Sequence, residues 1–318
     1  MFTRSTKNPI LKPDANYPWC SKKVYNPAIL FNDNKYHLFF RAVDENGKSS
    51  IGYGCSDDGE IFEIKNEPII KPIEKYETRG AEDPRIAKIN DKYFITYTGY
   101  DGQSARLHIA TSDNLIDWQK YGLAIPNWDM EKAKGFVVSW DFAQQTEIAK
   151  KEWSKAGGIF SEKIKEQYWM IFGDRNIWLA TSNNGINWEP IWQPFITPRK
   201  GLFDSEHVEM GPSPIKTDFG WLVLYHGIDD KMVYRLGYLL LGLNDPSKIL
   251  YRSNEPIFEP SASYELEGII DITNNNKPKV IFCCGAVLIN NTLKIYYGAG
   301  DSVICTASTD INNLIKNF

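Results

Sequence analysis

Alternating apolar and polar positions recur in five similar segments of the chain, and each alternation predicts a β-strand. Each segment opens near a lysine or another polar residue, runs through aromatic and aliphatic residues, and closes at an aspartate. The segments are 35–44, 92–101, 167–174, 220–229 and 293–301. Their mean spacing of about 64 residues indicates an internal repeat.

A companion strand follows several of these segments, at 51–59, 107–114 and 177–185, and ends in turn residues such as Asp-Gly or Asn-Gly. Paired strands at this period are typical of a propeller blade. We therefore expect an all-β protein with the fold of a five-bladed β-propeller, in which residues 1–318 form a single domain. A pair of β-sandwiches is the alternative. Only 141–155 favours a helix.

Charge and composition exclude several classes of function. The 36 Lys and Arg residues nearly balance 40 Asp and Glu, so no basic surface for nucleic acid is expected. No apolar stretch suits a membrane span or a secretory signal, which favours a cytoplasmic location. Five cysteines without a Cys-x-x-Cys pair, and four scattered histidines, predict no disulfide framework and no metal site. No phosphate-cradling glycine loop is present, so we expect no cofactor.

The repeat alignment brings polar residues to equivalent strand ends. In a propeller the innermost strand of each blade lines the central channel, and we expect the repeat strands to be innermost. Acids and one histidine would then converge on an axial site for a hydroxyl-rich ligand, although aspartate after a strand also commonly caps a turn. The residues are Arg41, Asp44, Asp101, Asp174, His226, Asp229 and Asp301.

Two dense clusters of charge precede the second and fourth repeats. The first, at 79–85, reads Arg-Gly-Ala-Glu-Asp-Pro-Arg and holds Asp83 beside a proline that stiffens the backbone. The second, at 203–212, supplies Asp204, Glu206, His207 and Glu209. Two carboxylate loops that feed one pocket suit glycoside chemistry, in which one acid protonates the leaving oxygen and another group activates water.

At these motifs the chain resembles glycoside hydrolase family 130, the mannoside phosphorylases and β-mannosidases. The matching segments span nearly the whole chain: 25–28, 40–43, 80–85, 97–102, 155, 159–164, 177–180, 204–205, 220–227, 264–268 and 296–301. The fold of that family is a five-bladed β-propeller, in agreement with the count of repeats.

The resemblance implies roles for individual residues. Asp83 matches the proton donor of the family, which is thought to act through the 3-hydroxyl of the bound mannose. Asn26, Arg41, Asp101 and Asp301 match positions that hold the sugar. The expected substrate-binding residues are Asn26, Arg41, Arg85, Tyr100, Asp101, Lys155, Asp174, His207, His226 and Asp301.

This sequence departs from the family pattern at the positions where the phosphorylases of the family bind phosphate. Phe-Gly-Asp at 172–174 replaces a His-Arg-Pro motif, His207 replaces a lysine, and Glu209 replaces a small residue. Fewer cations and an added carboxylate weaken a site for a doubly charged anion. We therefore expect an inverting β-mannosidase that hydrolyses β-1,2-linked manno-oligosaccharides, with Glu209 as base, Glu267 in reserve and Glu206 as a weaker third candidate.

Two other functions stay open. The first is a β-mannoside phosphorylase that produces mannose 1-phosphate and binds phosphate through Lys155, Arg175 and His226. His226 matches the phosphate-binding set of the family, and Lys155 matches a family lysine. The second is a sugar-binding propeller without catalytic activity, which would be expected to lose Asp83, and Asp83 is intact. In all three the partner is a manno-oligosaccharide.

Overall fold

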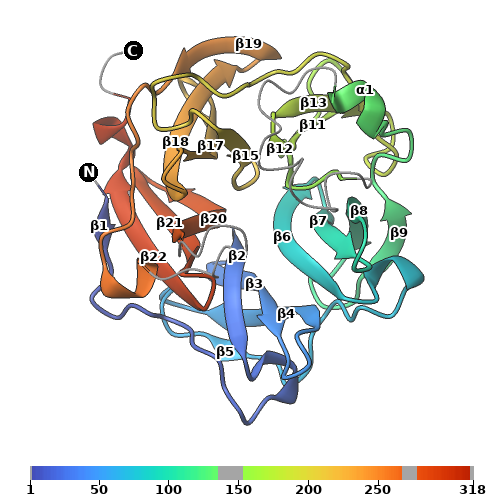
Figure 1. The fold of residues 1–318 in the computed structure, drawn as a ribbon, viewed down its shortest axis with the longest axis vertical. Coiled ribbons are helices and arrows are strands. Elements are labelled where there is room, and N and C mark those ends of the chain that lie inside the picture. The colour runs from blue at the N-terminus through green and yellow to red at the C-terminus, as the bar shows by residue number, and fades with distance from the viewer. Residues whose placement is uncertain (1, 135–152, 267–277, 316–318) are drawn as a thin grey trace.

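The structure is a computed structural model that describes residues 2–134, 153–266 and 278–315 (Figure 1). The described residues form mainly β-strands joined by turns and short 3₁₀ helices, so the all-β prediction is confirmed. The one α-helix among them, α1 (Met130–Lys134), spans five residues. Most of the helix expected at 141–155 falls on residues outside the described ones. No described helix is long and apolar enough to cross a membrane.

The strands follow one another in antiparallel groups, which we number in chain order. Group 1 consists of β2 (Lys23–Asn32), β3 (Lys35–Val43), β4 (Ser49–Ser56) and β5 (Glu63–Ile64). Group 2 consists of β6 (Gly80–Ile89), β7 (Lys92–Tyr100), β8 (Ala105–Ser112) and β9 (Gln119–Leu123). Group 3 consists of β10 (Gly157–Ile159), β11 (Tyr168–Phe172), β13 (Trp178–Ser182) and β14 (Glu189–Pro190).

Group 4 consists of β15 (His207–Met210), β16 (Ile215–Thr217), β17 (Gly220–Ile228), β18 (Val233–Gly242) and β19 (Asp245–Arg252). Group 5 consists of β20 (Lys279–Ile289), β21 (Thr292–Ala299), β22 (Val303–Asp310) and the N-terminal β1 (Thr3–Arg4). The short β12 (Asp174–Arg175) pairs with β15. Links between neighbouring groups join the strands into three sheets rather than one closed ring of hydrogen bonds.

The groups surround a common centre, toward which the first strand of each group lies (Figure 1). Strand β2 contacts both β6 and β20, and β6 contacts β10. A hollow of about 380 Å³ draws its lining from all five groups. It is lined by residues 29–31, 86–88, 159 and 161, 213–216 and 286–288.

The expectation that the repeat strands are innermost is wrong. The repeats form the second strands, β3, β7, β11, β17 and β21, each paired on both sides within its group. Successive residues of β7 and β17 are buried on both faces, which gives these strands a long and conspicuous apolar run. The first strands β2 and β6 carry prolines that interrupt theirs.

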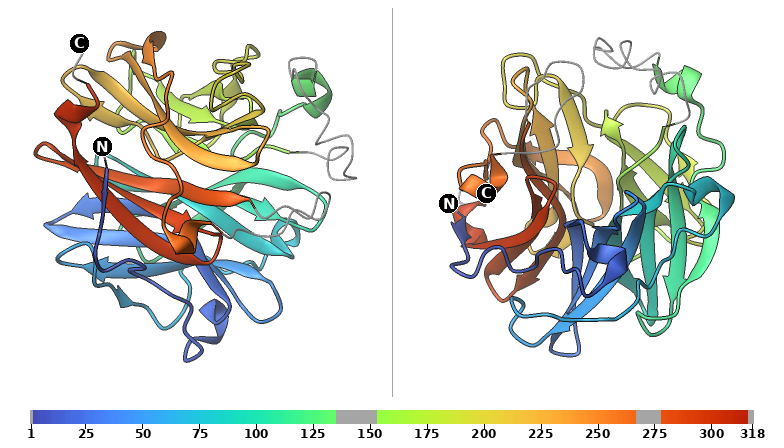
Figure 2. Two further views of the ribbon diagram at one scale, coloured as in Figure 1. Left: turned by 60° about the vertical axis from the view of Figure 1, so that its left-hand side comes forward. Right: turned by 60° about the horizontal axis from the view of Figure 1, so that its bottom comes forward.

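The two ends of the chain meet in group 5. Strand β1 pairs with β22, and Leu11 forms a further bridge to Ile304. Figure 2 shows the dark blue N-terminal strand beside the red C-terminal strands. This pairing completes the last group with a strand from the start of the sequence.

Three loops between groups are held by the same kind of cluster, which we call a clamp: a buried carboxylate, a tyrosine from the second strand and a cation from the outermost strand. In group 2 the Tyr97 hydroxyl donates to Glu77 at 2.6 Å, and the Lys120 ammonium donates to it at 2.5 Å. The other clamps are Asp204 with Tyr225 and Arg252, and Glu265 with Tyr297 and Arg4.

Groups 1 and 3 have phenylalanine at the position of the clamp tyrosine. Phe40 packs on Trp19 with ring centroids 5.8 Å apart, and Phe172 packs edge-on against Trp128 at 5.3 Å. Each tryptophan comes from the chain that precedes the first strand of its group. The five groups thus anchor their incoming chain in two ways, with ions where the repeat has tyrosine and with aromatic pairs where it has phenylalanine.

Candidate active site

Two bulges shape the inner strands that carry the predicted sugar-binding residues. The pairing of β2 with β3 shifts register between Tyr25 and Ala28, and that of β6 with β7 shifts between Glu82 and Arg85. Within these bulges Asn26 has a φ of 48° and Asp83 a φ of 51°, a conformation that Asn and Asp tolerate better than most residues. A proline follows each and needs no ladder partner. A bulge re-aims side chains, here toward each other.

Asn26, Arg41, Glu82 and Asp83 form a hydrogen-bonded set that we call the Asp83 cluster. The Asn26 amide donates to Asp83 at 2.8 Å. The Arg41 guanidinium donates to Glu82 at 2.6 Å and lies 3.4 Å from Asp83. It also sits 4.8 Å from the centre of the Tyr25 ring. Every distance here is that of a direct contact, so this cluster is already organised.

The two neighbouring carboxyls of this cluster are driven apart in pKa. Burial raises the pKa of Glu82, and the charge of Asp83 adds to that effect. Burial also opposes ionisation of Asp83, but the cations Arg41 and Lys155 outweigh it and hold the pKa of Asp83 below its usual range. Asp83 is therefore the more acidic member of the pair and is ionised near neutral pH in the unliganded protein.

Arg85, predicted to bind substrate, is directed elsewhere. Its guanidinium is buried and donates to the backbone carbonyls of Asp83, Met210 and Gly211 at 2.8–3.0 Å. These bonds tie the bulge of β6 to the end of β15. Arg85 thus positions Asp83 through the backbone.

A second set, the Glu209 cluster, consists of Lys155, Asp174, His207, Glu209 and His226. Asp174, Glu209 and His226 face one another across β12, β15 and β17, and residues opposite in a sheet share a face. The Lys155 ammonium lies 3.7 Å from Glu209, and the His207 ring lies 3.8 Å from it. Both distances exceed those of a direct hydrogen bond.

Charge fixes the protonation of this cluster. Burial opposes ionisation of Glu209, but Lys155 and His207 hold its pKa well below the usual range. Burial lowers the pKa of His226 to about 3, so its ring is neutral near pH 7. The ring accepts from the Cys283 amide at 2.8 Å through Nε2, which leaves the proton on Nδ1. It stacks on Phe282 with centroids 4.2 Å apart.

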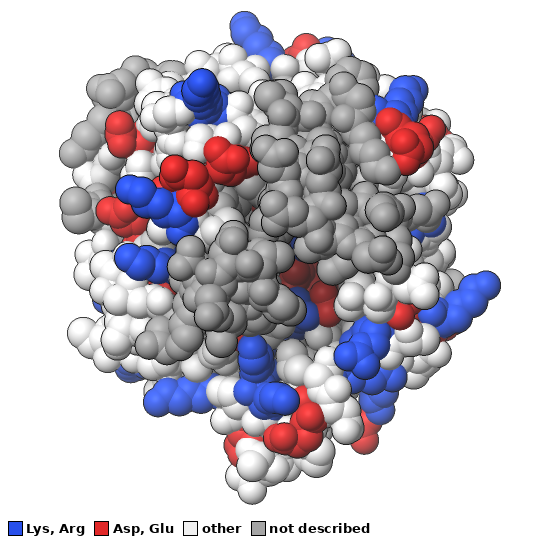
Figure 3. All heavy atoms as spheres, viewed as in Figure 1, with Lys and Arg blue, Asp and Glu red and all other residues white. Residues whose placement is uncertain are grey.

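Lys155 connects the two clusters. Burial lowers its pKa, but the fields of Glu209, Asp174, Asp83 and Glu82 together raise it above the usual value. The ammonium therefore stays charged within reach of carboxylates from both clusters. On the face seen in Figure 3, acidic and basic side-chain atoms gather in a hollow near the centre.

Several buried polar atoms of the two clusters have no hydrogen-bond partner among the described residues. Such atoms are rare in folded proteins and indicate where a polar ligand binds. They are Asn26 Oδ1, His207 Nε2, Glu209 Oε1 and His226 Nδ1. Three of these four atoms belong to the Glu209 cluster, so this cluster has more unmet hydrogen-bonding capacity than the Asp83 cluster.

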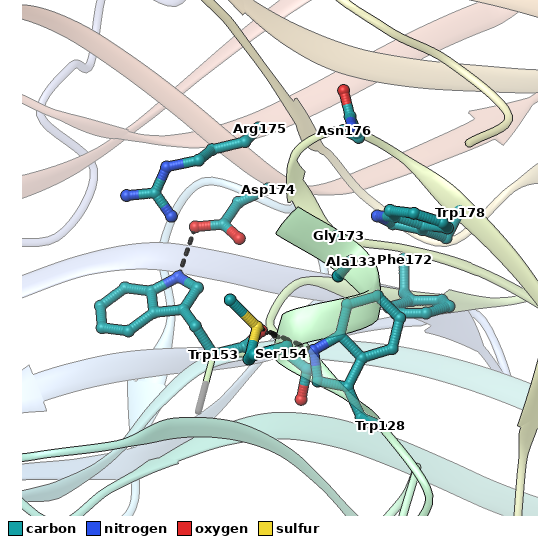
Figure 4. Close-up of a pocket in the computed structure, with 11 residues that line it drawn as sticks. Trp128, Ala133, Trp153, Ser154, Phe172, Gly173, Asp174, Arg175, Asn176 and Trp178 are labelled. Atoms are coloured by element: carbon teal, nitrogen blue, oxygen red, sulfur yellow. Dashed lines mark hydrogen bonds between the residues drawn. The ribbon is translucent and has the colours of Figure 1, made fainter. Parts of the chain in front are cut away.

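Asp174 and Arg175 border a narrow hollow beside the Glu209 cluster (Figure 4). The Trp153 indole donates to Asp174 at 2.5 Å, and Figure 4 shows the Arg175 side chain directed toward the same side. The hollow has a volume of about 20 Å³, enough for a single water. A sugar ring does not fit there.

Three strand-end aspartates have turn-capping roles. Asp44 accepts from the amides of residues 46 and 48, and Asp101 accepts from those of residues 103 and 104. Asp229 caps its turn in the same way and pairs with Arg235 at 2.7 Å. For Asp44 and Asp229 the turn interpretation replaces the axial one. A sugar contact of Asp101, and of Tyr100 at the end of β7, stays a prediction.

Other predicted residues are distributed as follows. Asp301 has a φ of 50°. Its charge acts on Tyr25, as does the charge of Asp83, and on Tyr234, as does the charge of Glu209. Asp301 therefore lies at the same end of the molecule as the two clusters. Asp204 lies in a clamp and not in either cluster. Glu206 is exposed. Glu267 lies outside the described residues. Among the residues described, no group of three or more His, Cys, Asp or Glu could hold a metal ion.

Sequence reasoning missed the clamps and the bulges. Glu77 and Glu265 drew no attention, although tyrosine in the second, fourth and fifth repeats, against phenylalanine in the first and third, marks the groups that have a clamp. The recurrence of Asn-Pro and Asp-Pro at equivalent places in β2 and β6 was the signal for the paired bulges.

Comparison with known proteins identifies a matching family and similar proteins. A family model described as β-1,4-mannooligosaccharide phosphorylase, of glycoside hydrolase family 130, matches residues 3–318. A 1,2-β-oligomannan phosphorylase of Thermoanaerobacter sp. (strain X514) is 35% identical over 98% of both chains. A β-1,2-mannobiose phosphorylase of the same organism is 35% identical over 96% of both chains.

Among solved structures, one from work on family 130 glycoside hydrolases that target β-1,2-mannosidic linkages in Candida mannan has a TM-score of 0.82. It is 30% identical to this chain, and the match covers 98% of this chain and 94% of that one. Both reactions thus occur among similar proteins, and the relatives with the higher identity carry out phosphorolysis.

The prediction of a hydrolase is wrong in the light of these relatives. The site offers a physical reason, because a base that activates water must be able to take up a proton. Lys155 and His207 hold the pKa of Glu209 well below its usual range, which weakens this carboxylate as a proton acceptor. With the family model matching nearly every residue, and the curated relatives matching over the same span, the chain belongs to glycoside hydrolase family 130.

Proposed function

We propose that this protein is a β-mannoside phosphorylase that cleaves β-1,2-linked manno-oligosaccharides with inorganic phosphate and releases mannose 1-phosphate. The observation that carries the proposal is the charged Lys155, which stands between the two carboxylate clusters beside buried polar atoms that have no hydrogen-bond partner in the described part of the chain. The phosphorylases that are 35% identical to this chain support the same reaction and the β-1,2 linkage.

The fold proposed for this activity is a five-bladed propeller formed by a single domain over 1–318. Five antiparallel groups and a hollow lined by all of them support it. The active site then lies on the axis, at the end where the bulges of β2 and β6 meet β12 and β15.

In the proposed reaction the Asp83 cluster holds the mannose ring that is transferred. Asn26 and Arg41 orient Asp83, which serves as the proton donor through the 3-hydroxyl of the sugar. A donor must be protonated, whereas Asp83 is ionised in the unliganded protein. A phosphate anion beside Lys155 would neutralise much of that cation's field at Asp83 and raise the pKa of Asp83. The acid would thus gain its proton when the nucleophile is in place.

The Glu209 cluster supplies the proposed phosphate subsite. Lys155 gives positive charge, and neutral His226 gives an N–H donor at Nδ1 that has no partner among the described residues. Charge-assisted bonds from an ammonium to an anionic oxygen are the stronger kind of hydrogen bond. Arg175, next to Asp174 on β12, is a further cation within this part of the site.

The test is incubation with β-1,2-mannobiose in the presence and absence of inorganic phosphate, with separate measurement of mannose 1-phosphate and free mannose. The proposal expects one mannose 1-phosphate and one mannose per bond cleaved, and a rate that depends on phosphate. Release of two free mannoses at the same rate without phosphate would overturn it.

A further inference from the structure

Glu209 is an unusual residue for an anion-binding site. Its carboxylate is 4% exposed, and it lies in the same cross-strand row as Asp174 and His226. A buried negative charge at this position repels a doubly charged anion by several kcal/mol at short range unless the contact includes a shared proton. An anion that binds next to Glu209 must therefore carry a proton that it can share with the carboxylate.

The hydrogen-bonding roles in this cluster are fixed and unequal. Lys155 has only donors, and neutral His226 offers one donor at Nδ1. In the unliganded protein Glu209 is ionised, because Lys155 and His207 hold its pKa low, and an ionised carboxylate can only accept. Its Oε1 has no hydrogen-bond partner among the described residues, and the nearest cation, Lys155, is 3.7 Å away. Of these three side chains, Lys155 and His226 thus present donors, and Glu209 presents an acceptor that needs a hydrogen.

Anions differ in whether they can satisfy such a site. Inorganic phosphate keeps at least one proton near neutral pH, so one of its oxygens is a donor and the others are acceptors. Sulfate has the same shape and, near neutral pH, the same double charge as hydrogen phosphate, but no proton. A site built around a fixed partner strongly rejects a ligand that lacks the matching hydrogen-bonding group.

We propose that Glu209 is the specificity-determining residue of the phosphate subsite, where it accepts a hydrogen bond from the protonated oxygen of phosphate and so excludes fully ionised oxyanions such as sulfate. This inference rests on the proposed phosphorolysis. It assigns to Glu209 a role in selecting the nucleophile, in place of the role in activating water that the sequence predicted.

The experiment compares three anions on the wild-type enzyme with β-1,2-mannobiose as substrate. Phosphate and arsenate, which both carry a proton near neutral pH, should both support cleavage. Sulfate should inhibit with a constant at least about 10²-fold above the KM for phosphate. Sulfate that competes as well as phosphate binds would overturn the inference, even if mannose 1-phosphate forms. Absence of mannose 1-phosphate with phosphate would instead overturn the proposed function.

A variant locates the effect at Glu209. In Glu209→Gln the amide offers an N–H donor, so sulfate inhibition should strengthen by at least about 10-fold relative to the phosphate KM. The matched control is Glu206→Gln, an exposed glutamate three residues earlier, which should leave the anion preference unchanged. An unaltered ratio in a folded Glu209→Gln enzyme would contradict the inference. If that variant does not fold, the anion series on the wild type still decides.

Discussion

The clamps and the Glu209 cluster contain the same ingredients, buried carboxylates beside cations, and arrange them in opposite ways. In the clamp of group 5, both oxygens of Glu265 accept hydrogen bonds, from Arg4, Tyr297 and two backbone amides, at 2.7–2.9 Å. In the Glu209 cluster the nearest cation stands at 3.7 Å and one carboxylate oxygen has no partner among the described residues. The clamp is complete, and the cluster is not.

The difference separates stability from function. A buried carboxylate whose bonds are all made adds rigidity and can do nothing further. One whose bonds are unmade destabilises the free protein and is retained where a ligand completes it. The Asp83 cluster lies between these cases, because its contacts are direct but its carboxyls have shifted pKa values. Perturbed pKa values of this kind mark functional sites.

The largest effect is expected at the acid. Asp83→Asn should lower turnover of β-1,2-mannobiose by about 10²–10⁴-fold, because an amide cannot donate the proton that the leaving group needs. The melting temperature should change little, since asparagine can still accept the bond from the Asn26 amide. The control is Asp44→Asn, the same chemical change at a turn, with activity close to that of the wild type. Near-native turnover in Asp83→Asn would place the acid elsewhere.

The clamp of group 2 should respond in stability and not in catalysis. Glu77→Gln removes the charge that Lys120 and Tyr97 contact and should lower the free energy of unfolding by about 3 kcal/mol, the lower end for a broken buried pair, because Lys120 keeps some exposure. Denaturant unfolding measures this loss, and activity per folded molecule should be unchanged. The matched variant Glu74→Gln, exposed in the same loop, should be neutral. A selective loss of activity in Glu77→Gln would erase the distinction between the two regions.

Removal of the cation that links the two clusters should act on one substrate only. Lys155→Met should raise the KM for phosphate by about 10–100-fold, the equivalent of one charge-assisted hydrogen bond, and leave the KM for mannobiose nearly unchanged. Initial rates with each substrate varied in turn measure the two constants. The exposed Lys165 provides the control, as Lys165→Met. Equal rises in both constants would mean that Lys155 binds sugar rather than phosphate.

The sequence alone predicted the all-β class of fold, and it singled out residues that the structure brings together in the Asp83 and Glu209 clusters, because both predictions follow from local signals. The repeat spacing and the turn residues sufficed for the all-β class and the five antiparallel groups. The Asp-Pro pair sufficed to single out Asp83, since a proline after an acid on a strand predicts a rigid interruption.

The order of strands within a group could not be predicted in the same way. The most conspicuous apolar runs belong to second strands such as β7 and β17, whose residues are buried on both faces. The inner strands are irregular because they carry the bulges. A search for regular apolar patterns therefore finds the second strands, such as β3 and β7, which support the site. It misses the first strands, β2 and β6, which carry the site residues.

The role of Glu209 depends on contacts that no local pattern contains. Its pKa is set by Lys155, which precedes group 3, and its row is completed by Asp174 on β12. From the residue types alone, Glu209 was expected to act as the base that activates water. In the structure the Lys155 ammonium lies 3.7 Å from the Glu209 carboxylate, and this cation makes the carboxylate a weaker proton acceptor.

The smallest expected effect separates the two regions by pH. The pKa of His226 is lowered to about 3 by burial, against 6.5 for the exposed side chain, so unfolding is accompanied by proton uptake below about pH 6.5. The stability that neutral His226 contributes is complete above that pH and declines as the pH falls toward 3. Near pH 5.5 the loss from His226 should reach about 1.4 kcal/mol relative to pH 8, and buried His108, whose pKa is lowered to about 4, adds to the same decline. Glu265, whose pKa is also lowered, although burial alone would raise it, should begin to lose its contribution only below about pH 4.3.

Denaturant unfolding as a function of pH should therefore show a first decline that His226→Gln reduces, and a second, more acidic decline that it leaves in place. An unchanged first decline in His226→Gln would show that the buried ring of His226 does not contribute to this loss of stability.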